Sequence, residues 1–249
     1  MARFALILPA AGRSTRFNNG KTKKVFTNLE GRAVWLRSAE PFVNRDDVHQ
    51  IIVAINPDDR ELFERRFRPN VAFLNIQVVE GGEERADTVA KALAAVDPTC
   101  DYVAIHDAAR PCIASESIDA VFSAAVEHGA ALLAIPVADT LKRADAAGTF
   151  AVETVPRAGL YQAQTPQVFR RDWLVEAYAN RSSLAENATD DARLVEALGR
   201  PCRLVPGSPL NIKITTQVDL KLAAAILDLL PKSKPDPPAG PFADERAGW

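Results

Sequence analysis

The amino-acid sequence predicts a doubly wound, Rossmann-like α/β fold, in which helices cover both faces of a mostly parallel sheet. Short apolar runs recur without polar alternation, which is typical of strands buried on both faces. Segments with helical spacing separate most of these runs, and this order favours parallel strands joined by right-handed crossovers. The 249 residues, 47% of them hydrophobic, suffice for one large core.

Each expected element follows from its own pattern. The apolar runs predict strands at residues 4–8, 50–55, 76–79, 102–105, 131–137 and 202–205. Apolar residues at helical spacing predict helices within residues 61–67, 88–96 and 118–126. An amphipathic helix is expected to close the domain within residues 214–230, with Thr216 as its N-cap.

Two segments interrupt or follow this alternation. Residues 139–157 predict two short polar strands around an Ala-Ala-Gly turn. A disordered loop is the alternative, but the strand-forming residues favour a β-arm that packs on another subunit of a homodimer. Residues 232–249 are rich in Pro, Gly and charge, which is typical of a flexible tail. We therefore expect one domain over residues 1–231, from which the arm protrudes.

Composition argues against several classes of protein. The formal net charge of -2 provides no overall field for nucleic acid or an anionic membrane. Cys100, Cys112 and Cys202 form no C-x-x-C pair, so we expect reduced thiols and neither a disulfide framework nor a zinc site. No apolar run approaches the roughly 20 residues of a spanning helix, and the N-terminus lacks a signal-peptide pattern. We expect a cytoplasmic protein that binds neither nucleic acid nor a membrane.

The loop after the first expected strand has the composition of an anion-binding site. Ligands of open α/β sheets bind beyond the carboxyl ends of the strands, and small residues there let backbone N–H groups approach a ligand. The loop contains neither G-x-G-x-x-G nor a P-loop motif. A solvated basic loop is the alternative. The small residues and the basic residues that follow them are Ala10, Ala11, Gly12, Arg13, Arg16, Lys21, Lys23 and Lys24.

The loops after two further strands place suitable groups at the same edge. Gly82 follows the third expected strand, and Arg85 and Thr88 begin the next helix, where a base or phosphate could meet backbone N–H groups. Asp107 follows the fourth strand, where it could accept a divalent cation or a ribose hydroxyl, and Arg110 lies beside it. A helix cap is the alternative for Asp107. His106 is expected to be a core histidine, because Mg²⁺ prefers oxygen ligands.

Seven stretches, in order along the chain, carry a resemblance to a known family: "PAAGRSTRF", "GGEERADTV", "HDAARP", "DTLKR", "QTPQVF", "TDDARLVEALG" and "NIKITTQVDL". They cover nearly the whole chain apart from the tail. The chain resembles the 2-C-methyl-D-erythritol 4-phosphate cytidylyltransferase family, the CTP-using enzymes of the non-mevalonate isoprenoid pathway. The first loop departs from the family's pattern, because Ser14 replaces a glycine and Lys23 a proline. We therefore expect a less rigid loop around Lys24, which falls on the position of the family's catalytic lysine.

The resemblance implies attack of a methylerythritol phosphate oxygen on the α-phosphorus of CTP, with release of pyrophosphate and no covalent enzyme intermediate. Lys24 and Arg16 would stabilise the pentavalent transition state. Mg²⁺ would bridge phosphate oxygens with Asp107 near it as a ligand. The backbone from Ala10 to Gly12 would border the nucleotide, and groups around Gly82, with the hydroxyl of Thr88, would recognise the base.

The resemblance also implies a site for the second substrate, a small polyol phosphate. By resemblance, this substrate would contact Thr140, Arg157, Thr189 and Lys213. The alternative for Lys213 is a surface lysine on an edge strand, and Thr189 could be a helix N-cap as well as a ligand. We expect Asp190 and Asp191 in the first turn of the helix that follows Thr189. Thr165 could line the site, but a buried turn fixed by Pro166 is the simpler expectation. The implied catalytic residues are Arg16, Lys24, Arg157 and Lys213. The implied substrate-binding residues are Ala10, Ala11, Gly12, Gly82, Arg85, Thr88, Asp107, Arg110, Thr140, Thr165 and Thr189, with Thr140 and Arg157 supplied by the arm of a second subunit.

Three other functions remain open at this point. An enzyme of the same architecture could use another polyol phosphate, such as ribitol 5-phosphate. A hexose 1-phosphate nucleotidylyltransferase is disfavoured, because those chains carry a longer glycine-rich first loop. A non-catalytic nucleotide-binding regulator is disfavoured by the presence of Arg16, Lys24 and Asp107 together.

Overall fold

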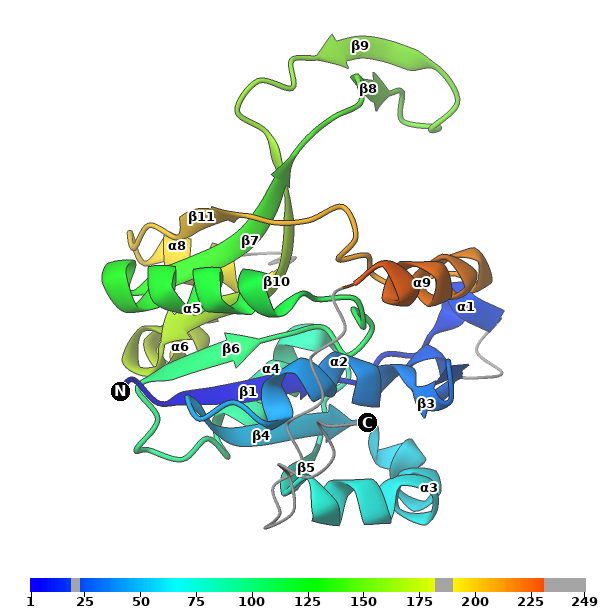
Figure 1. Ribbon diagram of the computed structural model, residues 1–249. Coiled ribbons are helices and arrows are strands. Elements are labelled where there is room, and N and C mark those ends of the chain that lie inside the picture. The colour runs from blue at the N-terminus through cyan, green and yellow to red at the C-terminus, as the bar shows by residue number, and fades with distance from the viewer. Residues whose placement is uncertain (19–22, 182–189, 231–249) are drawn as a thin grey trace, which may run out of the picture.

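The computed structural model describes residues 1–18, 23–181 and 190–230 of the chain. A central sheet carries helices on its faces, and one hairpin projects away from this body (Figure 1). The predictions made for Lys21, Thr189 and the tail lie outside the described residues.

Seven strands form the central sheet, in the order β11-β7-β10-β6-β1-β4-β5. They span Phe4–Pro9 (β1), Val48–Ile55 (β4), Ile76–Glu80 (β5), Tyr102–Ile105 (β6), Ala130–Pro136 (β7), Tyr161–Arg170 (β10) and Arg203–Pro206 (β11). Neighbours pair in parallel except β10, which is antiparallel to both β6 and β7. The sheet is mixed but mostly parallel, so the predicted doubly wound α/β fold is confirmed.

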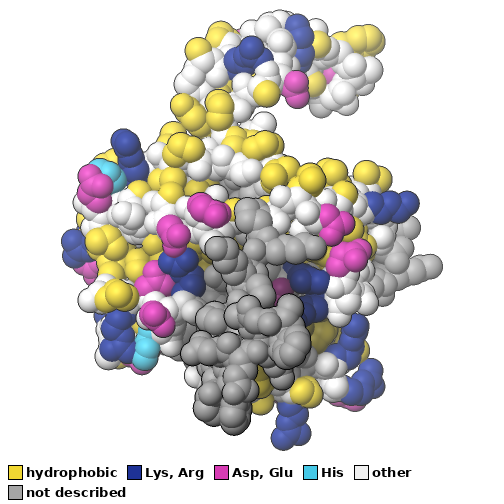
Figure 2. All heavy atoms as spheres, in the orientation of Figure 1, with side chains coloured by type: hydrophobic (Ala, Val, Ile, Leu, Met, Phe, Trp, Pro, Cys, Tyr) yellow, Lys and Arg dark blue, Asp and Glu magenta, His cyan; other side chains and the backbone are white. Residues whose placement is uncertain are grey.

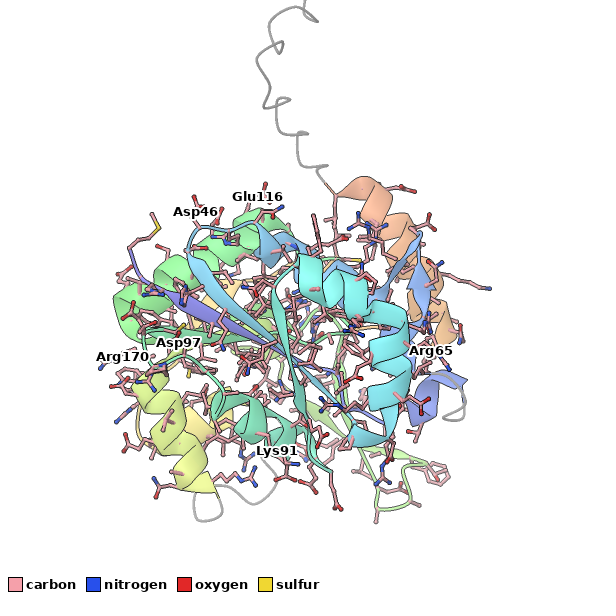
Figure 3. The ribbon with its side chains drawn as sticks, turned by 90° about the horizontal axis from the view of Figure 1, so that it is seen from below. Asp46, Arg65, Lys91, Asp97, Glu116 and Arg170 are labelled. Atoms are coloured by element: carbon pink, nitrogen blue, oxygen red, sulfur yellow. The ribbon has the colours of Figure 1, made fainter. Side chains whose placement is uncertain are left out.

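Helices cover both faces of this sheet, as the view from below makes clear (Figure 3). They span Val34–Val43 (α2), Arg60–Phe73 (α3), Arg85–Leu93 (α4), Ser115–His128 (α5), Arg171–Ala179 (α6), Ala192–Ala197 (α8) and Gln217–Leu229 (α9). One core lies between the sheet and α2, α3, α5 and α9, and a second lies between the sheet and α4, α6 and α8. Within the described part of the chain, no helix combines the length and apolar character needed to cross a bilayer.

Strand β1 is divided between the two cores. Phe4, Leu6 and Leu8 face one core, and Ala5 and Ile7 face the other. Leu6, Ile7 and Leu8 are fully buried, and burial of such a side chain stabilises the fold by roughly 1.5–3 kcal/mol. The carboxyl end of β1 is thereby fixed beside the ends of β4 and β6, so the loop that follows it starts from a rigid point.

Five short elements form the first loop and its surroundings. They are α1 (Thr15–Asn18), η1 (Lys24–Phe26), β2 (Asn28–Leu29), β3 (Arg32–Ala33) and η2 (Pro57–Asp59). The side chains of Val25 and Phe26 in η1 are buried. The Phe26 ring packs against Phe63 and Phe67 of α3, with centroids 5.7 and 5.8 Å away. This aromatic contact anchors η1 on the body of the domain.

The segment around Pro166 lies within a strand and is not the turn that the sequence predicted. It belongs to β10, where Gln164 and Gln167 are buried. Gln164 donates a hydrogen bond to the carbonyl oxygen of Ser208 at 2.8 Å, and Gln167 donates to Asp190 at 2.9 Å. These partners allow two polar side chains to be buried in β10, which therefore lacks the apolar pattern of the other buried strands.

The projecting hairpin consists of β8 (Leu141–Ala144) and β9 (Ala151–Val155), which pair with each other in antiparallel fashion. The space-filling view shows it as a separate lobe that bears hydrophobic side chains (Figure 2). Phe150 is 70% exposed and Val152 is 62% exposed. The hairpin therefore presents apolar surface to solvent in the single chain.

Candidate active site

A pocket of about 160 Å³ lies where the loops after β1, β5 and β6 meet. This is the edge at which ligands bind in open α/β sheets. Its walls consist of Pro9, Ala10, Ala11, Gly12, Ser14, Lys24, Val25, Gly82, Glu83, Glu84, Arg85, Thr88, Asp107, Ala108, Ala109 and Lys213.

Lys24 enters the pocket from the start of η1. Burial, followed by the neighbouring charge of Lys213, lowers the pKa of Lys24 from its ordinary value to about 8, and Arg16 acts in the same direction. Asp107 opposes this shift but does not cancel it. The charged form of Lys24 is thus disfavoured by burial and by two neighbouring cations, and a bound polyanion would stabilise it.

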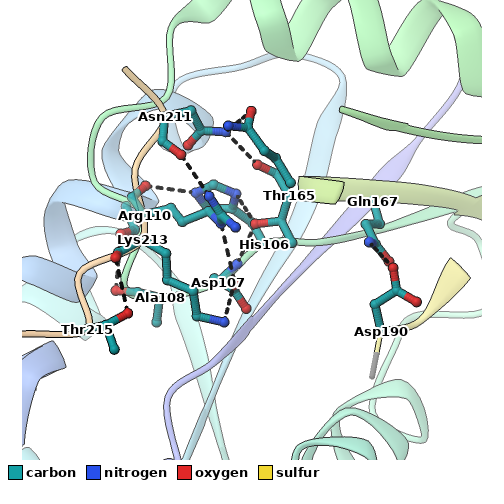
Figure 4. A network of polar contacts seen from close by, with 12 residues as sticks. His106, Asp107, Ala108, Arg110, Thr165, Gln167, Asp190, Asn211, Lys213 and Thr215 are labelled. Atoms are coloured by element: carbon teal, nitrogen blue, oxygen red, sulfur yellow. Dashed lines mark hydrogen bonds and ion pairs between the residues drawn. The ribbon is translucent and has the colours of Figure 1, made fainter. Parts of the chain in front are cut away.

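Asp107 is the carboxylate at which three cationic side chains meet, and two of them, Lys213 and Arg110, are seen beside it in Figure 4. The Nζ atom of Lys213 lies 2.8 Å from its Oδ2 atom, and the Nε atom of Arg110 lies 3.3 Å from the same oxygen. The Nε atom of Arg85 lies 3.6 Å from Oδ1. Burial opposes the charged carboxylate, but the three cations outweigh it and hold the pKa of Asp107 well below its usual range. Asp107 therefore remains charged and orients the cations around it.

Lys213 is held in place by the capped start of α9, and it does not lie on an edge strand. The predicted N-cap is confirmed, because the Thr216 hydroxyl accepts from the Asp219 N–H while the Asp219 side chain accepts from the Thr216 N–H. The N–H of Ile214 also donates to the carbonyl oxygen of Ala109 at 2.8 Å. The chain around Lys213 is thereby tied to the loop that carries Asp107.

Arg85 connects the pocket to a buried acidic group. Its Nη2 atom lies 2.8 Å from Oδ2 of Asp191, whose Oδ1 accepts a 2.5 Å hydrogen bond from the Tyr178 hydroxyl. Burial opposes the charge of Arg85, but Asp191 and Asp107 together keep its pKa above the ordinary value. The prediction that Asp190 and Asp191 lie in the first turn of a helix was wrong, since both precede α8, whose first turn has no acidic residue.

His106 and Thr165 form a buried hydrogen-bonded pair beside the pocket. The Nε2 atom of His106 lies 3.0 Å from the carbonyl oxygen of Arg110, so this nitrogen carries the proton. The Thr165 hydroxyl then donates to Nδ1 of His106 at 3.1 Å and accepts from the Asp107 N–H at 3.0 Å. Burial lowers the pKa of His106 to about 4, which keeps the ring neutral. This pair fixes the turn that carries Asp107.

The glycine loop after β5 closes tightly on the start of α4. The Gly82 N–H donates to the Thr88 hydroxyl at 3.1 Å, and this hydroxyl lies 3.0 Å from the carbonyl oxygen of Glu84. A Cβ atom at Gly82 would lie 2.3 Å from Cβ of Asp87, and one at Gly81 would lie 2.6 Å from Cβ of Ala11. The two glycines therefore permit a contact between loops that a larger residue would push apart.

The sequence-predicted residues fall into three groups in space. The arm residues Thr140 and Arg157 do not line the pocket of their own chain, and Arg157 instead donates to the carbonyl oxygen of Ala138. Arg16, Arg110 and Thr165 do not line the pocket, but the charge of Arg16 acts on Lys24 and the other two side chains contact Asp107. Nine predicted residues line the pocket: Ala10, Ala11, Gly12, Lys24, Gly82, Arg85, Thr88, Asp107 and Lys213.

One supporting residue that the sequence analysis missed is Asn211. Its buried side-chain amide donates to the Thr165 carbonyl oxygen at 2.9 Å, while its backbone carbonyl oxygen accepts from Arg110 at 2.7 Å. Its position in "NIKITTQVDL", two residues before Lys213, was the available signal. Ser14, Glu83 and Glu84 also line the pocket without having been predicted to do so.

Asp107 is the carboxylate that could bind a divalent cation beside the basic residues of the pocket, whose wall also contains Glu83 and Glu84. Both oxygens of Asp107 face cationic side chains. No group of three or more His, Cys, Asp or Glu side chains suited to a metal ion occurs among residues 1–18, 23–181 and 190–230. This donor set fits an ion such as Mg²⁺, which is usually held by one or two carboxylates together with substrate phosphates and water.

Comparison with known proteins gives a consistent result. The sequence model of the 2-C-methyl-D-erythritol 4-phosphate cytidylyltransferase family matches residues 4–229. Proteins of that name from Rhodopirellula baltica and Frankia casuarinae are 42% and 43% identical to this chain; the aligned regions cover 91% and 90% of this chain and 96% and 81% of theirs. The crystal structure of a protein of that name from Thermus thermophilus has a TM-score of 0.73 and 32% identity, covering 92% of this chain and 100% of its own.

Proposed function

The chain belongs to the 2-C-methyl-D-erythritol 4-phosphate cytidylyltransferase family, and from this premise we propose which residues perform the reaction. The enzyme is a nucleotidyltransferase that transfers CMP from CTP to 2-C-methyl-D-erythritol 4-phosphate. The products are 4-diphosphocytidyl-2-C-methyl-D-erythritol and pyrophosphate. The assignment of this chemistry to the pocket rests on one observation: Lys24, Asp107 and Lys213 converge at the carboxyl edge of the sheet.

Positioning and charge neutralisation account for the proposed mechanism. A phosphate monoester is already nucleophilic near neutral pH, so the enzyme must bring two polyanions together and stabilise charge at the α-phosphate. Lys24 and Arg16 would stabilise the transition state, and the backbone of Ala10 to Gly12 would border the triphosphate. Groups around Gly82 would recognise the cytosine, while Thr88 holds that loop in shape.

A divalent cation, Mg²⁺ in our proposal, would be held by Asp107 together with the substrate phosphates. Such an ion would neutralise charge on the phosphate oxygens and so reduce the repulsion between the two substrates. Asp107 would also act without a metal, because its ion pairs hold Lys213 and Arg85 in the pocket wall.

The second substrate would bind partly to residues of another subunit. We propose that Lys213 and Thr189 of one chain, with Thr140 and Arg157 from the arm of a second copy, hold the methylerythritol phosphate. The exposed apolar residues of the arm support a homodimer, because a hairpin with such residues gains stability by packing on a partner. The three cysteines are free thiols, which is typical of a reducing compartment, so we propose a cytoplasmic enzyme.

A pyrophosphate-release assay with a panel of substrates tests this proposal. Purified enzyme should use CTP at least roughly 10²-fold better than UTP in kcat/KM, because a site that hydrogen-bonds the cytosine leaves buried groups unpaired with uracil. It should also prefer methylerythritol phosphate to ribitol 5-phosphate. Equal use of CTP and UTP would contradict the proposed base recognition, and a preference for ribitol 5-phosphate would contradict the proposed second site.

A further inference from the structure

Ser14 has a backbone conformation that serine rarely adopts. Its φ of 55° lies in the left-handed region, where glycine is unstrained and a residue with a Cβ atom is not. The Ser14 hydroxyl accepts a hydrogen bond from the Lys24 N–H at 3.1 Å. This N–H stands at the start of η1, where a helix has no internal partner for it. The strained serine therefore satisfies the backbone of Lys24 across the loop.

Lys23, the residue before Lys24 in the sequence, makes a second contact that fixes this segment. Its Nζ atom lies 3.3 Å from Oδ2 of Asp59, and the two side chains are only 20% and 11% exposed. That oxygen is buried and has no hydrogen-bond partner among the described residues, so removal of Lys23 would leave a buried charge uncompensated. Asp59 ends η2 and directly precedes α3, so the ion pair ties the start of η1 to the start of this helix.

We propose that Ser14 and Lys23 are positioning residues for Lys24 and that together they hold its backbone at the pocket wall. Both stand where the first loop departs from the family's usual glycine and proline. The loop is thus not loosened by the departures, because each new side chain supplies a specific contact. This inference rests on the proposed role of Lys24, which the Lys24→Ala variant tests separately.

The Ser14→Gly variant distinguishes an effect on the position of Lys24 from an effect on the stability of the protein. Glycine removes the left-handed strain together with the hydroxyl, so the melting temperature should stay the same or rise. We expect kcat to fall roughly fivefold or more with little change in KM for CTP, because a misplaced catalytic group loses transition-state contacts. A merely structural serine would leave kcat unchanged. Glu30→Gly is the matched control: Glu30 has a φ of 49° but does not line the pocket, so its replacement should leave kcat unchanged.

Two substitutions test the role of Lys23: one removes its ion pair, and the other replaces the ion pair with the rigidity of a proline ring. Lys23→Met removes the ion pair and should lower kcat. Lys23→Pro also removes the ion pair but should retain most of the activity, because a proline ring imposes a φ close to the -70° of Lys23 and so holds the backbone in place of the ion pair. Asp59→Asn should lower kcat in the wild-type background and have little further effect on the Lys23→Pro enzyme. Equal losses from Asp59→Asn in both backgrounds would overturn the proposed role of Lys23.

A double-mutant comparison shows whether the effects act through Lys24. Ser14→Gly and Lys23→Met should cause no further loss when each is added to Lys24→Ala. If each lowers kcat equally in both backgrounds, or if neither lowers it in the wild-type background, the positioning proposal is wrong. A fully active Lys24→Ala enzyme would instead refute the proposed role of Lys24 itself. The two failures are therefore distinguishable.

Discussion

The pocket and the arm differ in what holds each of them together. In the pocket, Asp107 forms ion pairs with Arg85 and Lys213 of its own chain. In the arm, β8 and β9 pair only with each other, and Phe150 and Val152 face solvent. An isolated two-stranded hairpin is marginal in water. One chain thus orders its own charge cluster, whereas its arm has the properties of a segment that needs a partner.

The largest effect should come from the pocket, with Lys24→Ala. Removal of a charge that acts mainly in the transition state should lower kcat by roughly 10²-fold or more, with a smaller change in CTP affinity. Because the pocket belongs to one chain, the loss should not depend on enzyme concentration. Steady-state kinetics over a range of enzyme concentrations checks this. An unimpaired kcat would remove Lys24 from the mechanism and direct attention to Lys23 or Lys21.

A variant of the arm should behave differently. Val152→Asp places a charge on the exposed apolar surface and should weaken the proposed dimer without disturbing the pocket. We expect specific activity to fall about tenfold on dilution, because the loss follows dissociation by mass action. Light scattering and activity at matched concentrations test this. A variant that is monomeric yet fully active would contradict the claim that the arm, unlike the pocket, depends on a second subunit.

A smaller effect concerns the charge of Lys24. The pKa of Lys24 is lowered to about 8, so the cation is present below that pH and is lost as the pH rises through it. We expect kcat/KM for CTP to fall about fivefold between pH 8 and pH 9, since the protonated fraction falls by that factor. Bound phosphates should raise the pKa, so the fall in kcat should occur at higher pH. A kcat/KM that is flat up to pH 10 would contradict this assignment.

Local patterns predicted the parts of the fold that rest on burial alone. The apolar runs around Leu6 and Ile52 correspond to β1 and β4, because parallel strands buried on both faces contain few polar residues. Strand β10 was missed because the buried Gln164 and Gln167 depend on partners far along the chain. Helix α2 was missed as well, and it contains Pro41.

In the candidate site too, local patterns predicted some features, whereas contacts between distant residues could not be predicted. The loop composition at the strand ends placed Lys24 and Asp107 at the correct edge, because the carboxyl ends of parallel strands converge there. The ion pair between Arg85 and Asp191 could not be predicted from local spacing, since it joins residues more than a hundred positions apart. The role of Ser14 depended on a backbone φ that no sequence pattern specifies.

A subunit-mixing experiment tests the shared site most directly. Lys24→Ala subunits and Arg157→Ala subunits are each expected to be inactive as homodimers. After subunit exchange at equal concentrations, the mixture should recover about a quarter of the wild-type activity, because about half of the dimers are heterodimers with one intact site each. Native mass spectrometry measures the heterodimer fraction in the same sample. Background activity in the presence of heterodimers would show that Arg157 acts within its own subunit and would contradict the account.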